Sequence, residues 1–223
     1  MAENTLQYEW IVTIKGNLDV VFQDHADVFV AGDLLWYPVE GHPEISQAPD
    51  TLVAFGRPQG YRGSYIQHLE GGIAPQVVFE IQSPSNRTGE LIRKFRFYER
   101  YGVEEYYLYD PDDNELSGWQ RNGADLVEIS AMNGWVSPRL GVRFEWTKAG
   151  MVLYRPDGQR FLSFAEVAKA AEAAVAQLQE ASARAQEAIA RAQEAERQRE
   201  QAEQRAALLE AKLRALGADP AAQ

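Results

Sequence analysis

The chain has 223 residues, of which 45% are hydrophobic, contains no cysteine, and carries a formal net charge of −11 at pH 7. The lack of cysteine excludes disulfides, thiolate catalysis and cysteine-bound zinc. The sequence also lacks a run of about 18 uncharged apolar residues, which argues against a membrane span. Residues 1–159 hold 13 basic and 23 acidic residues, which disfavours general binding to nucleic acid because contacts to phosphates supply most of the non-specific affinity.

The distribution of aromatic residues divides the chain into two parts. All 24 aromatic residues precede residue 165, so only the first part has the side chains to build a large core. The length suits one domain of about 150 residues plus an appendage. We therefore expect a globular domain over residues 1–160 and a separate segment over residues 163–217. Residues 1–4 lack the basic and apolar pattern of a secretory signal, so we expect a cytoplasmic protein without membrane attachment.

The first half of the chain is predicted to form short strands separated by turns. Apolar or β-branched stretches indicate strands near residues 18–22, 26–31, 51–55 and 76–82. Glycine and proline mark two loops between these strands, residues 38–49 and 56–72. The second loop contains Arg57, Arg62 and Tyr65, and it either closes over a site or is an ordinary surface loop.

Glu80 is a charged residue in a strand that otherwise reads as buried. Side chains alternate along a strand, so Val78, Glu80 and Gln82 share one face. A lone carboxylate in such a place costs several kcal/mol, or its pKa rises until it is neutral, unless a cation or hydrogen-bond donors compensate. Asp50, which follows Pro49, would provide that compensation together with a divalent metal ion.

An amphipathic helix is predicted over residues 87–101, directly after this strand. Lys94 lies beside its apolar stripe, and Gly102 is a natural residue to end it. Residues 105–110 then read as a further strand, so the three elements form a βαβ-like unit. The segment 116–154 has the pattern of a meander of short strands with Asn-Gly turns.

The segment after Ser163 has the sequence of a coiled-coil helix. From Val167 to Leu216, apolar residues, mostly alanine, recur at alternating spacings of four and three residues, with Arg199 as the exception. We expect this helix to associate with itself, so that the chain forms a homo-oligomer, in particular a dimer. Contact should be firmer near residues 209–216 than along the alanine-rich middle, because alanine buries little area. The alternative is a single solvated helix with many pairs of glutamate and arginine.

Metal-dependent hydrolysis of a phosphodiester needs acidic ligands for the metal and a cation that steadies the attacking water or the developing charge. In the simplest arrangement the cation lies two residues after the strand carboxylate, but that position is Gln82, which has no charge. Lys94 is the obvious substitute, since a helix packed over the strand would direct its ammonium group toward Glu80. Its alternative role is a surface ion pair with Glu90.

Several short motifs follow one another in a fixed order along the first part of the chain. They are Gly32-Asp33-Leu34, Ala48-Pro49-Asp50, Phe79-Glu80-Ile81-Gln82-Ser83-Pro84-Ser85, Lys94, Tyr98, Gly102-Val103-Glu104-Glu105-Tyr106-Tyr107 and Asp110-Pro111. Their combination, over about residues 20–160, resembles the Uma-type endonuclease family of the PD-(D/E)XK superfamily. The resemblance implies an α/β fold with a restriction-endonuclease-like mixed sheet core and flanking helices, followed here by the long C-terminal helix. It also implies that Asp50 and Glu80 are metal ligands and that Lys94 is a displaced catalytic lysine.

The resulting hypothesis is a metal-dependent DNA endonuclease that hydrolyses phosphodiester bonds. Asp50 and Glu80 hold Mg²⁺ or Mn²⁺ in this hypothesis, the backbone carbonyl of Ile81 adds a ligand, Lys94 stabilises charge at the phosphate, and Gln82 is a further candidate catalytic residue. Four arginines of the predicted helix would supplement the contact with phosphate: Arg87, Arg93, Arg96 and Arg100.

Two questions stay open at this point. A third carboxylate, either Asp33 or Glu70, would complete the metal site, although Asp33 is also a plain turn residue. The second hypothesis is a catalytically inactive nuclease-like scaffold that assembles through its C-terminal helix. The acidic first part, the uncharged Gln82 and the long apolar seam support it.

Overall fold

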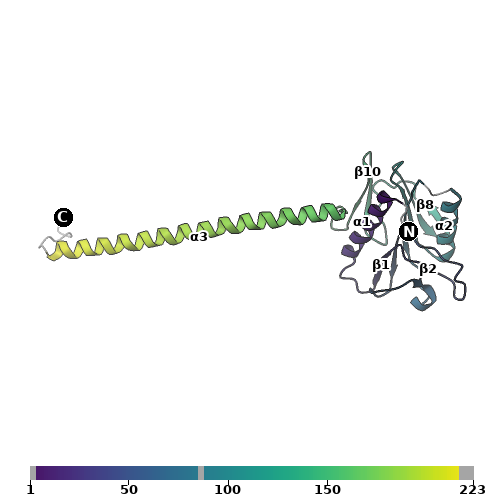
Figure 1. Cartoon of the computed structure of the whole chain (residues 1–223), viewed down its shortest axis with the longest axis horizontal. Helices are drawn as coiled ribbons and strands as arrows, with labels where there is room; N and C mark the ends of the chain where they lie inside the picture. The colour runs from purple at the N-terminus through teal and green to yellow at the C-terminus, as the bar shows by residue number, and fades with distance from the viewer. Residues whose placement is uncertain (1–3, 85–87, 216–223) are drawn as a thin grey trace. The chain divides into compact units, whose positions relative to one another are not determined.

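A computed structural model describes residues 4–84 and 88–215 of the chain. The chain divides into two compact units between Glu166 and Val167. The first contains the strands and the helices α1 and α2, and the second contains most of helix α3 (Figure 1). Within the described ranges, no helix combines the length and apolarity that a membrane span requires. Residues 1–3, on which the expectation about a secretory signal rests, lie outside these ranges.

A six-stranded mixed sheet forms the centre of the first unit. Its order is β1-β3-β5-β6-β7-β8, in which β5 and β6 are parallel and all other neighbours are antiparallel. The strands are β1 (Val28–Gly32), β3 (Thr51–Phe55), β5 (Val77–Ile81), β6 (Glu105–Asp110), β7 (Glu115–Asn122) and β8 (Asp125–Glu128). The mixed α/β class is therefore confirmed, as are the strands predicted near 26–31, 51–55 and 76–82.

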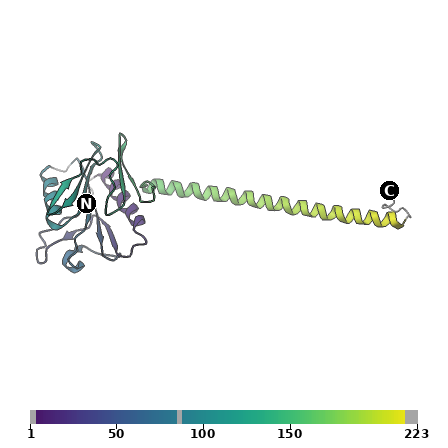
Figure 2. The same cartoon turned by 180° about the vertical axis from the view of Figure 1, so that it is seen from behind.

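Helices α1 (Thr5–Val21) and α2 (Thr88–Tyr101) lie on opposite faces of the sheet, as the two opposite views in Figures 1 and 2 show. Alternation along β5 explains the two layers. Phe79 packs in one buried cluster with residues of α1, while Val78 packs in a second cluster with Tyr98 of α2. Each face of the sheet is thus covered, and β5 lies between the two cores.

Helix α1 shows that the predicted strand at residues 18–22 was wrong, because these residues form the end of this helix. Two valines favour a strand locally, yet Ile11, Ile14 and Leu18 recur at helical spacing and are buried against the sheet. The side chain of Asn4 caps the first turn of the helix. Burial of the apolar stripe therefore outweighs the local preference for a strand.

Helix α2 joins the parallel strands β5 and β6 and confirms the predicted βαβ-like unit. The helix ends at Tyr101, and Gly102 follows it with a φ of 97°, a left-handed conformation that favours glycine. The predicted first residue of this helix, Arg87, lies outside the described residues.

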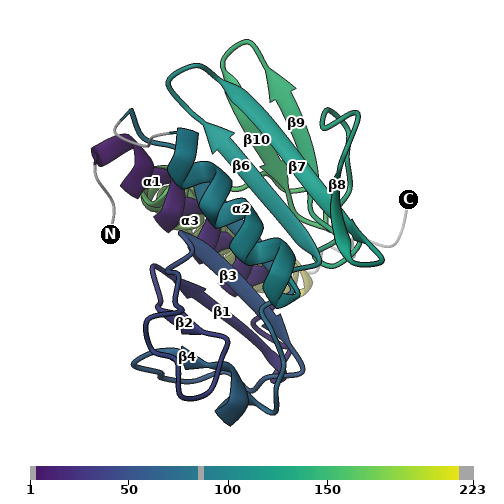
Figure 3. The same ribbon diagram turned by 90° about the vertical axis from the view of Figure 1, so that its right-hand side faces the viewer.

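Two small sheets extend the two cores (Figure 3). The parallel pair β2 (Trp36–Tyr37) and β4 (Tyr65–Ile66) contributes Trp36 and Tyr65 to the cluster on the α2 side. The antiparallel pair β9 (Arg143–Thr147) and β10 (Gly150–Tyr154) packs on the α1 side. The loop predicted over residues 56–72 is thus partly wrong, because it contains β4 and the short 3-10 helix η1 (Gln67–Glu70). The short strands predicted over residues 116–154 are present, but they form two antiparallel hairpins in different sheets, β7–β8 in the main sheet and β9–β10 in the small one, and not one continuous meander.

Helix α3 (Phe164–Ala215) is 52 residues long, and every residue from Val167 to its end is exposed. It begins with a capping box, in which Ser163 Oγ accepts from the Glu166 N–H and Glu166 accepts from the Ser163 N–H. The predicted helix extended to residue 217, and the last two of these residues lie outside the described part of the chain.

Candidate functional site

Glu80 is a buried carboxylate in the middle of the main sheet. It lies in β5, whose five residues are all buried, and only 2% of its surface is exposed. Strands β3 and β6 flank β5 on both sides. Because Glu80 shares its face of the strand with Val78, its side chain points toward α2. The charge predicted inside the sheet is present, and its compensation has to come largely from α2.

Two side chains of α2 bind the Glu80 carboxylate. Lys94 Nζ donates to Glu80 Oε2 at 2.8 Å, and the Tyr98 hydroxyl donates to the other oxygen, Oε1. Lys94 and Tyr98 are four residues apart, which places them on one face of the helix. The structure therefore directs Lys94 toward Glu80, as the helical spacing predicts, and the role of Tyr98 as a second donor was not predicted.

Burial controls the ionisation of this pair. It raises the pKa of Glu80 to about 7, against the opposing charge and hydrogen bond of Lys94, and the neighbouring charge of Asp50 acts in the same upward direction. Burial lowers the pKa of Lys94, but the charge and hydrogen bond of Glu80 together outweigh it, and the pKa of Lys94 is raised. Lys94 therefore keeps its positive charge at neutral pH. A further cation beside Glu80 would favour the ionised form of its carboxyl group.

Asp50 lies immediately before β3 and is 5% exposed. Its Oδ2 accepts hydrogen bonds from the Ile81 N–H at 2.7 Å and from Gln7 Nε2 at 3.4 Å. Burial raises the pKa of Asp50, although the hydrogen bond from Ile81 and the charge of Lys94 oppose this rise. Asp50 and Glu80, which are distant in sequence, therefore occupy one electrostatic environment.

Gln7 of α1 is a further member of this site that the sequence reasoning missed. Its Nε2 donates to the Ile81 carbonyl at 2.9 Å as well as to Asp50 Oδ2. These are two of the oxygens that were predicted to bind a metal. Gln7 is 4% exposed, so its amide group is buried beside them. The helical spacing of Gln7 with Ile11, Ile14 and Leu18 was a signal that would have placed Gln7 on the buried face of a helix, although not beside Asp50 and Ile81.

Two buried hydroxyl groups of the main sheet have no hydrogen-bond partner among the described residues: Thr51 Oγ1 and Tyr106 OH. Thr51 follows Asp50 in the chain. Burial raises the pKa of Tyr106 well above its usual value, and the charges of Glu80 and Asp50 raise it further. Unpartnered buried polar groups are costly and uncommon in folded proteins. Because the charges of both carboxylates act on Tyr106, its unpartnered hydroxyl indicates a polar centre whose internal contacts are incomplete.

The remaining candidates near β5 take different positions. Ile81 contacts the site through its backbone. Its N–H donates to Asp50, and its carbonyl accepts from Gln7. Gln82 is half-buried just beyond the end of β5, where its N–H donates to the Tyr109 carbonyl at 2.8 Å. The backbone of Ile81 is thus part of the site, while the described contact of Gln82 holds the sheet together.

Neither candidate for a third carboxylate ligand joins Asp50 and Glu80. Asp33 has a φ of 50° in the turn after β1, and its N–H donates to the Asp50 carbonyl at 3.3 Å. Glu70 binds Arg57 at 2.9 Å and Arg62 at 2.6 Å. In residues 4–84 and 88–215, no group of three or more Asp, Glu or His side chains is placed to hold a metal ion. The protein contributes two carboxylates to this centre.

The arginines of α2 lie on its outer surface. Arg96 pairs with Glu99 at 3.0 Å and is 71% exposed, and the guanidinium of Arg100 lies 5.6 Å from the centre of the Tyr101 ring. Arg93 is also exposed. These side chains are accessible for contact with an anion, and Arg87 lies outside the described residues.

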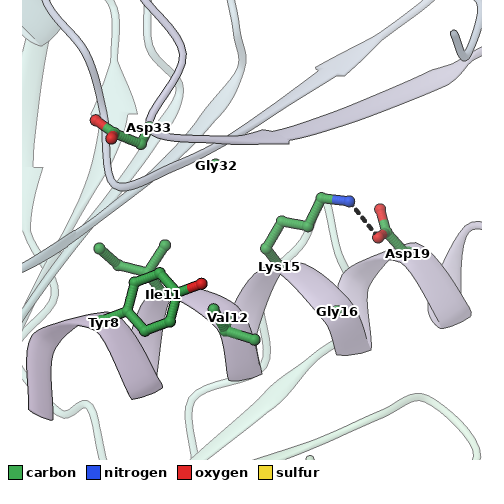
Figure 4. Close-up of a pocket in the computed structure, with 8 residues that line it drawn as sticks. All are labelled: Tyr8, Ile11, Val12, Lys15, Gly16, Asp19, Gly32 and Asp33. Carbon is green, nitrogen blue, oxygen red and sulfur yellow. Dashed lines mark hydrogen bonds and ion pairs between the residues drawn. The ribbon is translucent and has the colours of Figure 1, made fainter. Parts of the chain in front are cut away.

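A cavity of about 530 Å³ lies on the other side of the sheet, between α1 and the end of β1 (Figure 4). Tyr8, Ile11 and Val12 give it an apolar wall, and Lys15 pairs with Asp19 at one end. Neither Asp50 nor Glu80 lines this cavity. The candidate site is therefore defined by its buried polar groups rather than by a large apolar pocket.

The comparisons with known proteins identify the family. The sequence pattern of the Uma2 family, described as "Putative restriction endonuclease", matches residues 4–163. The chain belongs to the Uma2 family. This confirms the resemblance read from the motifs and extends it to α1 and Gln7. By its description, the Uma2 family is one of restriction-endonuclease-like nucleases.

A solved structure from Anabaena variabilis ATCC 29413, described as "a putative nuclease belonging to DUF820", is similar to this Uma2 protein. The two share 13% sequence identity, with a TM-score of 0.45, over 62% of this chain and 74% of the other. No curated protein matches the Uma2 chain.

Proposed function

We propose that the chain is an endonuclease that hydrolyses phosphodiester bonds in DNA with the help of Mg²⁺ or Mn²⁺. The observation that carries this proposal is the buried cluster in which Glu80, held by Lys94 and Tyr98, shares one environment with Asp50. A structural carboxylate has little reason to lie in the middle of a sheet beside a second one. Functional sites are where such costly arrangements are retained.

The donor set of the site fits a hard divalent cation. Asp50, Glu80 and the Ile81 carbonyl all offer oxygen, the ligand atom that Mg²⁺ and Mn²⁺ prefer. Both carboxylates are deprived of water by burial, and each disfavours the charge of the other. A bound divalent cation would offset this repulsion and polarise the phosphate and its attacking water.

Gln7 is our candidate for the missing third ligand. Its amide nitrogen now donates to the two oxygens proposed as ligands, on Asp50 and Ile81. A half-turn of an amide group exchanges its nitrogen and its oxygen. Gln7 therefore supplies an oxygen at the site without adding a third negative charge to two carboxylates that are already poorly compensated.

Lys94 has two roles in this proposal. It neutralises part of the charge of Glu80 through the bond at 2.8 Å, and its side chain is 14% exposed, so it connects the buried carboxylate to the surface of α2. An ammonium group held there stabilises the negative charge that develops on a phosphate in the transition state. Tyr98 fixes the other oxygen of Glu80 and so orients the carboxylate.

Cleavage of supercoiled plasmid and of single-stranded DNA tests the proposal. The wild-type chain should cut with Mn²⁺ and not with EDTA, and Glu80→Gln should reduce the rate by at least about 100-fold, the usual effect of losing a group that stabilises the transition state. The matched control is Glu104→Gln, which removes a half-exposed carboxylate that pairs with Arg139. Equal rates for wild type and Glu80→Gln would identify a contaminating nuclease and refute the proposal.

Calorimetric titration with Mn²⁺ separates this proposal from an inactive nuclease-like scaffold. The wild type should bind one ion per chain, and Asp50→Asn should weaken binding strongly because it removes a charged ligand. A wild type that binds no Mn²⁺ and cuts no DNA would support the scaffold. The exposed helix α3 and the uncharged Gln82 are the two observations that favour the scaffold.

A further inference from the structure

Helix α3 presents an apolar stripe to solvent. Of the larger apolar residues on this stripe, Leu178 is 73% exposed, Leu209 53% and Leu213 45%. No residue of the described helix is buried. A helix of this length gains most of its stability from packing its apolar face, which α3 does not do within its own chain.

The stripe has the seven-residue repeat of a two-stranded coiled coil. Counting positions of the repeat from a to g, the a positions are Ala171, Leu178, Ala185, Ala192, Arg199, Ala206 and Leu213. The d positions of the described helix are Val167, Ala174, Ala181, Ala188, Ala195, Ala202 and Leu209. The repeat runs without a break from Val167 to Leu213, so one continuous seam follows the helix.

The charges beside this seam are segregated by position. The g positions carry four basic residues, which are Arg184, Arg191, Arg205 and Lys212. The e positions of the C-terminal half carry three acidic residues, which are Glu196, Glu203 and Glu210. In the C-terminal half of the helix, one edge of the seam is therefore basic and the other acidic. Such edges determine how two helices choose their orientation.

We propose that α3 pairs with α3 of a second copy of the chain in a parallel, in-register, two-stranded coiled coil. In a parallel pair, each g residue faces the e residue five positions later on the other helix. Arg191 then meets Glu196 of the partner subunit, and Arg205 meets Glu210 of the partner subunit. In an antiparallel pair, g faces g and e faces e. Basic residues would then face basic residues and acidic residues would face acidic residues, and both contacts would be repulsive.

The existing contacts of these side chains do not compete strongly with the pairing. Arg184 binds Glu180 and Arg191 binds Glu187 four residues away on their own helix, and all four side chains are at least 63% exposed. Such pairs contribute only about 0.3–0.5 kcal/mol. Arg191 can therefore exchange or share its partner when a second helix approaches, whereas Arg184 has no acidic residue to face in the parallel pair and keeps Glu180.

The polar residue of the seam agrees with a dimer. Arg199 occupies an a position and binds Glu203 at 3.1 Å, with its side chain 81% exposed. In a two-stranded coil this long side chain can keep its charge at the edge of the seam, while a larger bundle would bury it. A single polar residue at an a position commonly sets the register and the number of helices.

The parallel orientation has a consequence that rests on the proposed function. Both N-terminal units would attach to the same end of the paired helices, since each chain enters α3 at Phe164. An antiparallel pair of 52-residue helices would hold the two attachment points roughly 78 Å apart, at about 1.5 Å per residue. The parallel coil thus keeps two catalytic sites available to one duplex.

Disulfide trapping in the full-length chain tests the orientation directly, because the natural chain has no cysteine. Ala174→Cys and Ala202→Cys each place one thiol at a d position, near the two ends of the seam. Ala176→Cys is the matched control on the outer face. Under mild oxidation, both d-position variants should form covalent dimers, and the control should form at least tenfold less. In an antiparallel pair, a residue faces the same residue of the other chain only at the midpoint of the paired helices. Residues 174 and 202 cannot both lie at that midpoint, so an antiparallel pair cannot give both covalent dimers.

The molecular mass by light scattering completes the test. The wild type should have the mass of two chains and dissociate on dilution, and this result is independent of any nuclease activity. A monomer or a trimer at all concentrations would overturn the proposal. Trapping of only one d-position variant, or of the control as readily as the others, would also overturn it.

Discussion

Two ion pairs of similar chemistry lie in opposite surroundings in this molecule. Lys94 and Glu80 meet inside the N-terminal unit, with side chains 14% and 2% exposed, whereas Arg184 and Glu180 meet on α3, with side chains 77% and 63% exposed. Water screens the second pair and leaves the first nearly unscreened. Forming the inner pair and breaking it therefore both require much free energy, whereas the outer pair can change partners with little change in free energy.

This contrast agrees with the different roles that we propose for the two units. In the N-terminal unit, buried polar groups on α1, α2, β3 and β5 are held in one arrangement, as a site that performs chemistry requires. On α3, every described residue from Val167 onward is exposed, and the charges are arranged along edges. Rigid polar centres suit catalysis, and exposed charged edges suit assembly. All five tryptophans precede residue 165, so tryptophan fluorescence reports on the first unit alone.

The largest effect is expected for Lys94→Met, which removes the ammonium group and keeps most of the side-chain volume. Breaking a buried pair by removing one partner costs about 3–5 kcal/mol. We expect the free energy of unfolding to fall by about 3 kcal/mol, near the lower limit, because the Glu80 carboxyl can take up a proton instead. Urea unfolding followed by tryptophan fluorescence measures this change. A loss below about 1 kcal/mol would show that the pair behaves like a surface pair.

Glu70→Gln tests a second carboxylate, which lies between two arginines at the edge of the same unit. The hydrogen bond from Arg62 lowers the pKa of Glu70, against the opposing effect of burial, and Arg57 lowers it further. We expect a loss of roughly 2 kcal/mol at pH 7, since hydrogen bonds to charged groups contribute about 1.5–3 kcal/mol.

The dependence of this loss on pH has a definite sign. A carboxylate with a lowered folded-state pKa adds stability above its ordinary pKa of 4.5, and this stability is lost as the pH falls through the folded-state value. The difference between wild type and Glu70→Gln should thus be full at pH 7 and shrink below about pH 4.5. A difference that stays constant from pH 7 to pH 3 would contradict the role of the two arginines.

The inner site shows what the sequence could and could not predict. Glu80 was predictable because a charge in an apolar strand is conspicuous, and Lys94 because helical spacing placed it beside the apolar stripe that packs on that strand. Both inferences depend on local periodicity. Both placements agree with the structure because α2 directly follows β5 along the chain, so Glu80 and Lys94 are close in sequence as well as in space.

Gln7 could not be found in the same way. Its two partners lie 43 and 74 residues further along the chain. No local pattern encodes a contact between residues so far apart in the sequence. In addition, a strand was wrongly predicted at residues 18–22, so the helix that carries Gln7 was not predicted. The direction of α1 across the sheet is decided by burial of its apolar stripe, which becomes visible only when the strands are in place.

Gln7→Ala gives a smaller effect that compares the two units directly. It removes the hydrogen bonds to the Ile81 carbonyl and to Asp50, and an ordinary hydrogen bond contributes about 1 kcal/mol. We expect a loss of about 1–1.5 kcal/mol by tryptophan fluorescence. The matched control, Gln193→Ala on the exposed face of α3, should leave the free energy of unfolding within about 0.5 kcal/mol, measured by circular dichroism at 222 nm because α3 has no tryptophan.

The smallest effect is expected for Arg184→Gln on α3. Its partner Glu180 precedes it by four residues, and such a pair stabilises a helix by about 0.3–0.5 kcal/mol. In the proposed parallel coil, Arg184 faces Ile189 of the partner subunit, so the substitution removes no charge pair between helices. Circular dichroism at 222 nm should show a slightly lower melting temperature for the helix, and salt should erase the difference because it screens exposed charges. A loss above about 1 kcal/mol that persists in salt would mean that this part of α3 is packed, and the contrast between the two units would no longer hold there.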